Sequence, residues 1–307
     1  MFEKNNNTAI GGGLLLAVIC WGGNNVGTKW LVADWPPILT GMTRVLIAGG
    51  LLLGILRVTT WMGEFKPMPH GFWSKLWLRG GLGLAAYFVP YCWALHLTAA
   101  SHVALYIGAS PIWALVAEER PRRNWASVRR YTSALLALGG IVVLFWPALR
   151  SGKENLLGEF CGLCASLAWA NYSWQARILS QTIPGVEAAA HSMWMSGVWL
   201  LPLCLVEMFM NHPVVVMDKT HLTVQALCIF FGGVVPYTLW NSALRHWRAS
   251  QVMMFNNFIP LTTASWAHFA LHEPFTPTFC AAVGLVVSGV LISQMDWAKI
   301  FRLSEGF

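Results

Sequence analysis

Long apolar runs alternate with short polar segments along the whole 307-residue chain. A helix needs roughly 17 to 25 residues to cross about 30 Å of hydrocarbon, and ten runs approach that length. The connections between them are short and rich in Pro, Gly and charged residues, as in turns. The pattern therefore predicts an all-α integral membrane protein with ten transmembrane helices, at about residues 9–30, 37–56, 72–95, 100–117, 131–146, 157–179, 188–210, 222–244, 250–271 and 277–295.

The second half of the chain repeats residues of the first half in the same order. Pairs separated by 149 positions are Ala94 and Ala243, Leu95 and Leu244, Ala100 and Ala249, Ser101 and Ser250, and Pro111 and Pro260. Pairs separated by 148 positions are Trp21 and Trp169, Lys29 and Arg177, and Pro36 and Pro184. Because each half holds an odd number of predicted helices, we expect two inverted five-helix repeats, at 1–149 and 150–307. Such repeats predict a site between them near the middle of the membrane.

Composition supports a membrane class. Apolar residues make up 56% of the chain and charged residues 11%, with a mean hydropathy of +0.54. A soluble domain carries about 25% charged residues. The net charge of +7 is compatible with a nucleic-acid partner, but the basic residues lie in short loops between apolar runs. That placement favours a role in membrane orientation, with the lipid bilayer rather than nucleic acid as the surrounding partner.

The distribution of basic residues predicts the orientation. With the N-terminus in the cytoplasm, 15 of the 20 Lys and Arg residues fall on the cytoplasmic side, four fall outside, and Arg44 lies within a helix. Positive charge prefers the cytoplasmic side, so both termini are predicted to be cytoplasmic. The polar N-terminal segment runs straight into the first apolar run without a cleavage pattern, which favours a retained helix over a signal peptide.

Cysteine usage predicts neither a metal site nor a disulfide framework. All seven cysteines lie inside apolar runs. Cys161 and Cys164 have a spacing found in metal and redox sites, but no partner pair accompanies them, so packing of small residues is the better interpretation. We expect no metal and no cofactor.

Polar residues inside the predicted helices are the candidates for function, because an unsatisfied polar group in hydrocarbon costs several kcal/mol. Trp21, Asn25 and Lys29 follow each other at four-residue spacing and share one helix face. A structural explanation accounts for this stripe as well as a role in substrate binding does: Trp21 would pack in the interior, and Lys29 would extend its side chain to the lipid headgroups. Arg44 lies about 10 Å into the second helix. It has two interpretations, a site for a carboxylate or a tether to helix-end carbonyls.

The second half supplies similar candidates. Trp169 and Tyr172 share a helix face, and Trp169 is the repeat partner of Trp21. Asn256 and Asn257 precede Pro260, which places amides beside a freed backbone carbonyl. Packing and interhelical hydrogen bonds are the competing explanation for all of these. The complete set of predicted substrate-binding residues is Trp21, Asn25, Arg44, Tyr91, Tyr106, Ser110, Trp169, Tyr172, Tyr237, Asn241, Asn256 and Asn257.

These residues are similar to a known family. Trp21-Gly22-x2-Asn25-x3-Lys29, followed by Pro36-Pro37 and Arg44, resembles the opening signature of the EamA branch of the ten-helix drug/metabolite transporter superfamily. A second signature of the family is similar to Ala94-Leu95-x2-Thr98-Ala99-Ala100-Ser101, then Pro111 and Glu118 or Glu119. The resemblance implies a bacterial inner-membrane exporter of small molecules, monomeric or homodimeric. It departs from the family at Glu118-Glu119, where a Gly-Glu pair is usual.

The residues distinguish two function classes, transport and intramembrane catalysis. A transporter of small amphipathic metabolites, most of all amino acids and possibly aromatic ones, fits the repeats and the aromatic and amide residues at mid-depth. Multidrug efflux is the alternative within transport, and an acidic residue at mid-membrane would favour it for organic cations. An intramembrane enzyme needs a nucleophile with a base, or a metal cluster, at one depth, and the sequence shows neither pattern. We therefore expect a transporter and not an enzyme.

Overall fold

The computed structural model describes residues 7–59, 68–113, 125–151 and 153–294, and all the regular structure in these ranges is helical. Within these ranges, four helices are long and apolar enough to cross a membrane: Asn7–Leu31, Pro37–Val58, Gly185–Met210 and Lys219–His246. The described part of the chain is thus all-helical and includes helices that can span a membrane. Glu118, Glu119 and the ends of the predicted helices at 100–117 and 277–295 lie outside the described residues.

The helices of the first half correspond in sequence to the predicted apolar runs. They are α1 (Asn7–Leu31), α2 (Pro37–Val58), α3 (Phe72–Lys75), the π-helical η1 (Leu76–Leu82), α4 (Gly83–Leu97), α5 (Ala100–Gly108) and α7 (Trp125–Ser151). α3, η1 and α4 follow one another without a break, so one predicted helix is built from three segments. α2 begins at a proline, whose missing N–H and fixed φ suit the first helical position.

The second half has a similar order of elements. They are α8 (Lys153–Ser180), α9 (Gly185–Asn211), α10 (Lys219–Leu227), the π-helical η2 (Cys228–Val234), α11 (Val235–His246), α12 (Ala249–Met253), the 3-10 segment η3 (Met254–Phe258), α13 (Ile259–Leu271) and α14 (Pro277–Gln294). A π-helical segment therefore interrupts the same predicted helix in both halves.

Each π-helical segment carries a glycine pair at a close helix contact. A Cβ on Gly81 of η1 would lie 2.6 Å from the Cβ of Met195 on α9. A Cβ on Gly233 of η2 would lie 2.7 Å from the Cβ of Ala48 on α2. Only a residue without a side chain permits these approaches, so the glycines set how closely η1 and η2 pack on their neighbours.

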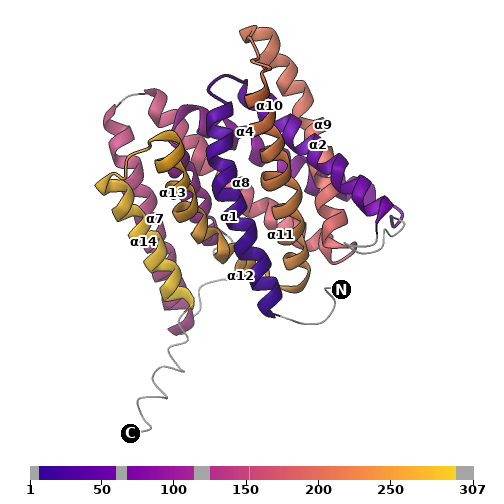
Figure 1. Ribbon diagram of the computed structural model, residues 1–307. Coiled ribbons are helices and arrows are strands. Elements are labelled where there is room, and N and C mark those ends of the chain that lie inside the picture. Colours follow the sequence, from indigo (N-terminus) through magenta and orange to yellow (C-terminus); the bar gives the residue numbers. More distant parts are fainter. Residues whose placement is uncertain (1–6, 60–67, 114–124, 152, 295–307) are drawn as a thin grey trace.

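Helices of the first half pack directly against helices of the second half. α2 lies along α9, α4 along α8, α1 along α13 and α7 along α14, so each of these pairs joins one helix of each half. α7 and α14 form one flank of the bundle, and α2 and α9 the opposite flank (Figure 1). We call the end at which α1, α4 and α13 finish the upper end, as it is drawn in Figure 1, and the opposite end the lower end. The main apolar core lies between these pairs, around Trp21, Tyr91 and Trp169.

Candidate substrate pocket

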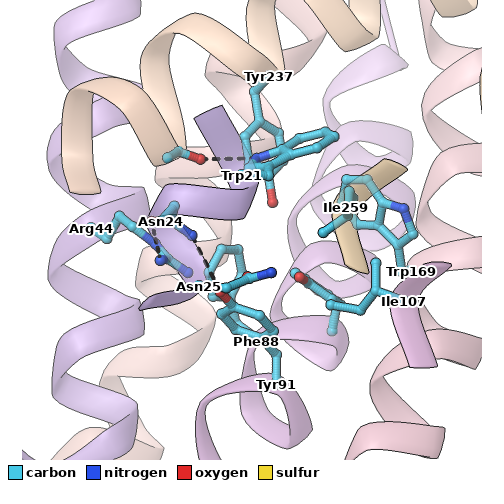
Figure 2. A pocket seen from close by; sticks show the side chains of 12 residues that line it. Trp21, Asn24, Asn25, Arg44, Phe88, Tyr91, Ile107, Trp169, Tyr237 and Ile259 are labelled. Atoms are coloured by element: carbon cyan, nitrogen blue, oxygen red, sulfur yellow. Dashed lines mark hydrogen bonds between the residues drawn. The ribbon is translucent and has the colours of Figure 1, made fainter. Parts of the chain in front are cut away.

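A small cavity lies where helices of both halves meet (Figure 2). Its volume is about 20 Å³, close to what one water molecule requires. The lining comes from α1, α2, α4, α5, α8, η2, α11 and α13 and consists of Trp21, Asn24, Asn25, Arg44, Tyr87, Phe88, Tyr91, Ile107, Trp169, Gly232, Tyr237 and Ile259. The cavity therefore combines one cation, two amides and a majority of aromatic or apolar groups.

Arg44 is the only charged group among the residues that line this cavity, and its side chain is 2% exposed. Its Nη1 donates to Asn24 Oδ1 and to Thr28 Oγ1, both at 2.7 Å. Within the part of the chain that the structure describes, Nε has no hydrogen-bond partner and no carboxylate lies within ion-pair distance of Arg44. Its contacts also correct one of the two sequence interpretations, because Arg44 bonds to side chains of α1 and not to helix-end carbonyls.

Two aromatic rings lie close to the guanidinium. Its central carbon lies 4.9 Å from the ring centroid of Phe88 and 5.4 Å from that of Tyr91. Cation–π contacts of this kind contribute about 0.5 to 2 kcal/mol, rising as the group loses water. They hold the charge in place without neutralising it.

A chain of side-chain hydrogen bonds leads from Arg44 across the cavity. Asn24 Nδ2 donates to the hydroxyl of Tyr91 at 3.2 Å, and that hydroxyl donates to Asn25 Oδ1 at 2.7 Å. Asn25 Nδ2 then donates to Thr263 Oγ1 at 3.0 Å. The chain thus connects α2, α1 and α4 of the first half with α13 of the second. In Figure 2 the labelled Arg44, Asn24, Asn25 and Tyr91 gather on one side of the cavity.

Aromatic side chains form the other wall. The ring centroids of Trp21 and Trp169 are 5.2 Å apart at an interplanar angle of 87°, an edge-to-face contact between the two halves. Trp21 also contacts Tyr237 at 5.5 Å, and its Nε1 donates to the carbonyl of Gly232 at 3.1 Å. Figure 2 shows Trp21 and Tyr237 close together and Trp169 on the opposite side of the cavity from Arg44.

Six of the predicted site residues line this cavity: Trp21, Asn25, Arg44, Tyr91, Trp169 and Tyr237. Two more lie directly behind its wall. The ring centroid of Tyr172 is 5.6 Å from that of Trp169, and Asn241 Nδ2 donates to the carbonyl of Tyr237 at 3.0 Å. Tyr172 and Asn241 therefore support residues of the lining without belonging to it.

Four predicted residues lie away from the cavity. Asn256 Nδ2 donates to Ser110 Oγ at 3.0 Å, so these two side chains are paired at the contact between η3 and the end of α5. Asn257 Nδ2 donates to the carbonyl of Met254, three residues earlier in the chain. Tyr106 packs in a separate apolar cluster with Leu105 and Phe279. The prediction that Asn256 and Asn257 bind substrate is corrected on this point, because the amides of η3 bond within a packed interface.

The sequence reasoning missed Asn24, Tyr87, Phe88, Ile107, Gly232 and Ile259. Asn24 had a usable signal: it precedes Thr28 by four residues, so the two share a helix face and together match the donors of one guanidinium. The apolar residues of α4, α5 and α13 carried no such signal. Only the packing of helices distant in sequence brings them to the cavity.

Comparison with known proteins gives the family. The sequence model of the EamA-like transporter family matches residues 11–146 and, a second time, residues 156–295. The chain belongs to the EamA-like transporter family. It is therefore a membrane transporter, and its family accounts for the membrane-spanning helices.

Relatives of similar length carry transporter names. An uncharacterized transporter of Archaeoglobus fulgidus is 23% identical over 91% of this chain and 95% of its own length. A probable amino-acid metabolite efflux pump of Escherichia coli K12 is 21% identical over 95% of this chain and 97% of its own length. Among solved structures, a crystal structure of a protein matches the fold with a TM-score of 0.67 at 18% identity, over 94% of this chain and 96% of the other.

Proposed function

We propose that this transporter exports small amphipathic metabolites that carry a carboxylate, amino acids with aromatic side chains foremost. The observation that carries the proposal is Arg44, a buried cation that has no carboxylate partner in the described part of the chain and that lines a central cavity. Burying a charge without a counter-charge is costly. A substrate carboxylate would supply the missing partner.

The geometry of Arg44 suits this role. Nη1 is already occupied by Asn24 and Thr28, whereas Nε has no partner. The Nε and Nη2 edge of a guanidinium matches the two oxygens of a carboxylate. Anchoring by α1 holds that edge in one orientation, so less side-chain freedom is lost when the substrate binds.

The aromatic wall accounts for the rest of the substrate. Trp21, Trp169 and Tyr237 offer flat, apolar surfaces with hydrogen-bonding edges, and Trp169 lies on the far side of the cavity from Arg44. Aromatic pairs favour edge-to-face contacts, as these rings already make with each other. The Escherichia coli relative is named for amino-acid metabolites, which agrees with this substrate class.

We propose further that the chain forms two inverted repeats of five transmembrane helices each, at 1–149 and 150–307, which give alternating access. Two matches to one family model support the duplication. Equivalent contacts at opposite ends support the inversion: Lys29 Nζ donates to the carbonyl of His96 at 3.4 Å, and Arg177 Nη1 donates to that of Leu244 at 3.3 Å. Both members of the second pair lie 148 positions after those of the first.

A cavity of about 20 Å³ is too small for an amino acid, so helices must separate to admit the substrate. α4 contains Pro90, and Pro236 lies in the first turn of α11. A proline inside a helix weakens its hydrogen-bond ladder and permits bending. We propose that bending at these two positions opens the cavity first to one side and then to the other.

The same proposal places the chain in the bacterial inner membrane with both termini in the cytoplasm. It rests on the 15 basic residues assigned to that side against four on the other. The lower end, where α1 begins, is then cytoplasmic and the upper end faces outward.

Counterflow in proteoliposomes tests the substrate and the role of Arg44 together. Vesicles loaded with unlabelled compound should take up a labelled aromatic amino acid, and should not take up the corresponding amine without a carboxylate. Arg44→Gln should lower this counterflow about tenfold to a hundredfold, because a charge-assisted pair with the carboxylate contributes roughly 1.5 to 3 kcal/mol.

Arg79→Gln serves as the matched control, since Arg79 is exposed at the lower end of the bundle. Transport at the wild-type rate by a well-folded Arg44→Gln protein would exclude the carboxylate role. Uptake of a cationic dye in place of the amino acid would instead support multidrug efflux.

A further inference from the structure

A second polar cluster lies behind the aromatic wall of the cavity, on the second half of the chain. It consists of Tyr172 on α8, Ser192 on α9 and Asn241 on α11, and each of these side chains is 1% exposed or less. The side chains of Ser192 and Asn241 lie beside the Tyr172 hydroxyl, within hydrogen-bonding reach of it. We call these three residues the distal cluster.

The polar atoms of the distal cluster are not satisfied within the described part of the chain. The Tyr172 hydroxyl, Ser192 Oγ and Asn241 Oδ1 are buried there without a hydrogen-bond partner of good geometry. The indole N–H of Trp169, which lines the cavity in front of the cluster, has no such partner either. Buried polar groups are nearly always hydrogen-bonded, because an unpaired one has lost its bonds to water and gained none. Four such atoms in one place point to a polar group of a ligand as their partner.

The distal cluster occupies positions that correspond to the Arg44 network of the first half. Arg44 and Asn24, which bond to each other at 2.7 Å, correspond at an offset of 148 to Ser192 and Tyr172. Ser192 and Tyr172 also lie beside each other. The two halves therefore bring equivalent positions together, with a cation and an amide in the first half and two neutral hydroxyls in the second.

Arg44 and the distal cluster lie on opposite sides of the cavity. Successive distances of 5.0 to 5.6 Å connect the guanidinium to the ring of Tyr172, by way of the rings of Tyr91, Tyr87 and Trp169. Trp169 is on the side of the cavity opposite Arg44 (Figure 2), and Tyr172 contacts Trp169 from behind the wall. A substrate whose carboxylate binds Arg44 would therefore direct the far end of its ring toward the cluster.

The chemistry of the cluster indicates which substrate group it would bind. Asn241 Oδ1 accepts hydrogen bonds, the indole N–H of Trp169 donates one, and the hydroxyls of Tyr172 and Ser192 can do either. No charged group among the described residues acts on the Tyr172 hydroxyl, so a charged substrate group would be buried there without a counter-charge. A neutral hydroxyl, which both donates and accepts, matches the cluster instead.

We propose that the distal cluster is a specificity subsite for a hydroxyl group on the far end of the substrate ring, so that phenolic amino acids are the preferred substrates. The inference deepens the proposed function and rests on it, because it places the substrate carboxylate at Arg44. A phenolic substrate would then contact both halves of the chain, the first half through Arg44 and the second half through the distal cluster.

Access to the cluster requires a motion that the proposed function already includes. A cavity of about 20 Å³ holds no amino acid, and Trp169 and Tyr237 separate it from Tyr172 and Asn241. A shift of these two rings would enlarge the cavity and bring the unpartnered atoms of the cluster to its surface. Hydrogen bonds with a phenolic hydroxyl favour that enlarged state, whereas a phenyl ring cannot form them.

Ligand-induced thermal stabilisation tests the subsite without transport. The purified protein in detergent is titrated with L-tyrosine and with L-phenylalanine, which differ by one hydroxyl. The apparent Kd of each amino acid follows from the rise of the unfolding temperature with its concentration. The wild-type protein should bind tyrosine about fivefold to tenfold more tightly than phenylalanine, the factor that one hydrogen bond contributes on balance.

Two variants remove single hydroxyls of the cluster. Tyr172→Phe and Ser192→Ala should each reduce the preference for tyrosine to about twofold or less. A purely structural role of these hydroxyls would change the binding of both amino acids alike and keep the ratio of their Kd values. Ser180→Ala is the matched control, because Ser180 is also on α8 and has a buried hydroxyl without a partner in the described structure, but it lies about two turns beyond Tyr172. It should keep the wild-type preference.

Two results would overturn the subsite: equal affinity of the wild-type protein for the two amino acids, or folded Tyr172→Phe and Ser192→Ala proteins that keep the wild-type preference. The outcome is separable from that of the proposed function. If only the subsite is wrong, Arg44→Gln weakens both amino acids while the cluster variants keep the ratio. If Arg44 binds no carboxylate, Arg44→Gln keeps both affinities while Tyr172→Phe still lowers the ratio. A lack of stabilisation by either amino acid would reject both proposals.

Discussion

Arg44 shows how much the immediate partners of one residue decide about its role. Its position within an apolar run fixes only that the charge must be satisfied inside the membrane. Bonds to Asn24 and Thr28 occupy one nitrogen and leave Nε without a partner in the described structure. The same residue with a carboxylate beside it would be a structural ion pair. The lack of such a partner among the described residues is what makes it a candidate binding group.

Trp169 and Asn256 are expected to differ in what their loss affects. Trp169→Ala removes an aromatic wall of the cavity and should raise the half-saturation concentration for counterflow about tenfold, for a loss near 1.4 kcal/mol.

Asn256→Leu breaks its bond with Ser110 and should instead lower the unfolding temperature in detergent, for a cost of about 1 to 3 kcal/mol. Cys204→Ala, on α9 away from the cavity, is the control for both. If Asn256→Leu keeps the wild-type unfolding temperature but changes substrate affinity, Asn256 belongs to the substrate site after all.

At the scale of elements, glycines decide how closely helices of the two halves pack. Gly81 and Gly233 lie in the π-helical segments. A Cβ added to either glycine would lie closer than van der Waals distance to a Cβ on a helix of the other half. Gly49 of α2 is tighter still, since its Cβ would lie 2.5 Å from the backbone nitrogen of Trp194 on α9. Small residues of this kind allow helix association in membranes, where van der Waals packing replaces the hydrophobic driving force.

A pair of adjacent glycines tests this contact. Gly49→Val should force α2 away from α9 and cost about 1 to 3 kcal/mol, because the obstructing atoms belong to backbone and cannot yield. Gly50→Val points into open space and should have little effect. Thermal unfolding of the purified proteins in detergent measures both. Equal unfolding temperatures for the two variants would show that the α2–α9 contact is looser than described.

At the scale of the whole molecule, the proposed orientation is open to direct measurement. Thr220 is exposed at the upper end and Ser74 at the lower end. In a cysteine-free background, Thr220→Cys should react with an impermeant maleimide in intact cells. Ser74→Cys should react only after the cells are permeabilised, because 15 of the 20 basic residues assign that end to the cytoplasm. The reverse labelling pattern would show that the upper end is cytoplasmic and that the proposed orientation is wrong.

The sequence by itself determined the class and the family of the protein. Helix-length apolar runs, a low charge content and paired positions such as Trp21 and Trp169 depend only on the order of residues, so they are visible without coordinates. Six of the twelve predicted site residues line the cavity for a related reason: an Arg, an Asn or a paired Trp inside an apolar helix stands out against its surroundings.

The tertiary structure alone decided which of these residues face each other. Asn256 and Asn25 are both amides inside apolar segments, yet Asn256 bonds to Ser110 in a packed interface and Asn25 lines the cavity. Tyr87 and Ile259 reach the cavity although nothing in their local sequence distinguishes them from lipid-facing residues. The physical reason is that helix rotation and crossing are set by close packing between distant segments, such as glycine contacts with the other half, and a linear pattern does not contain these distances.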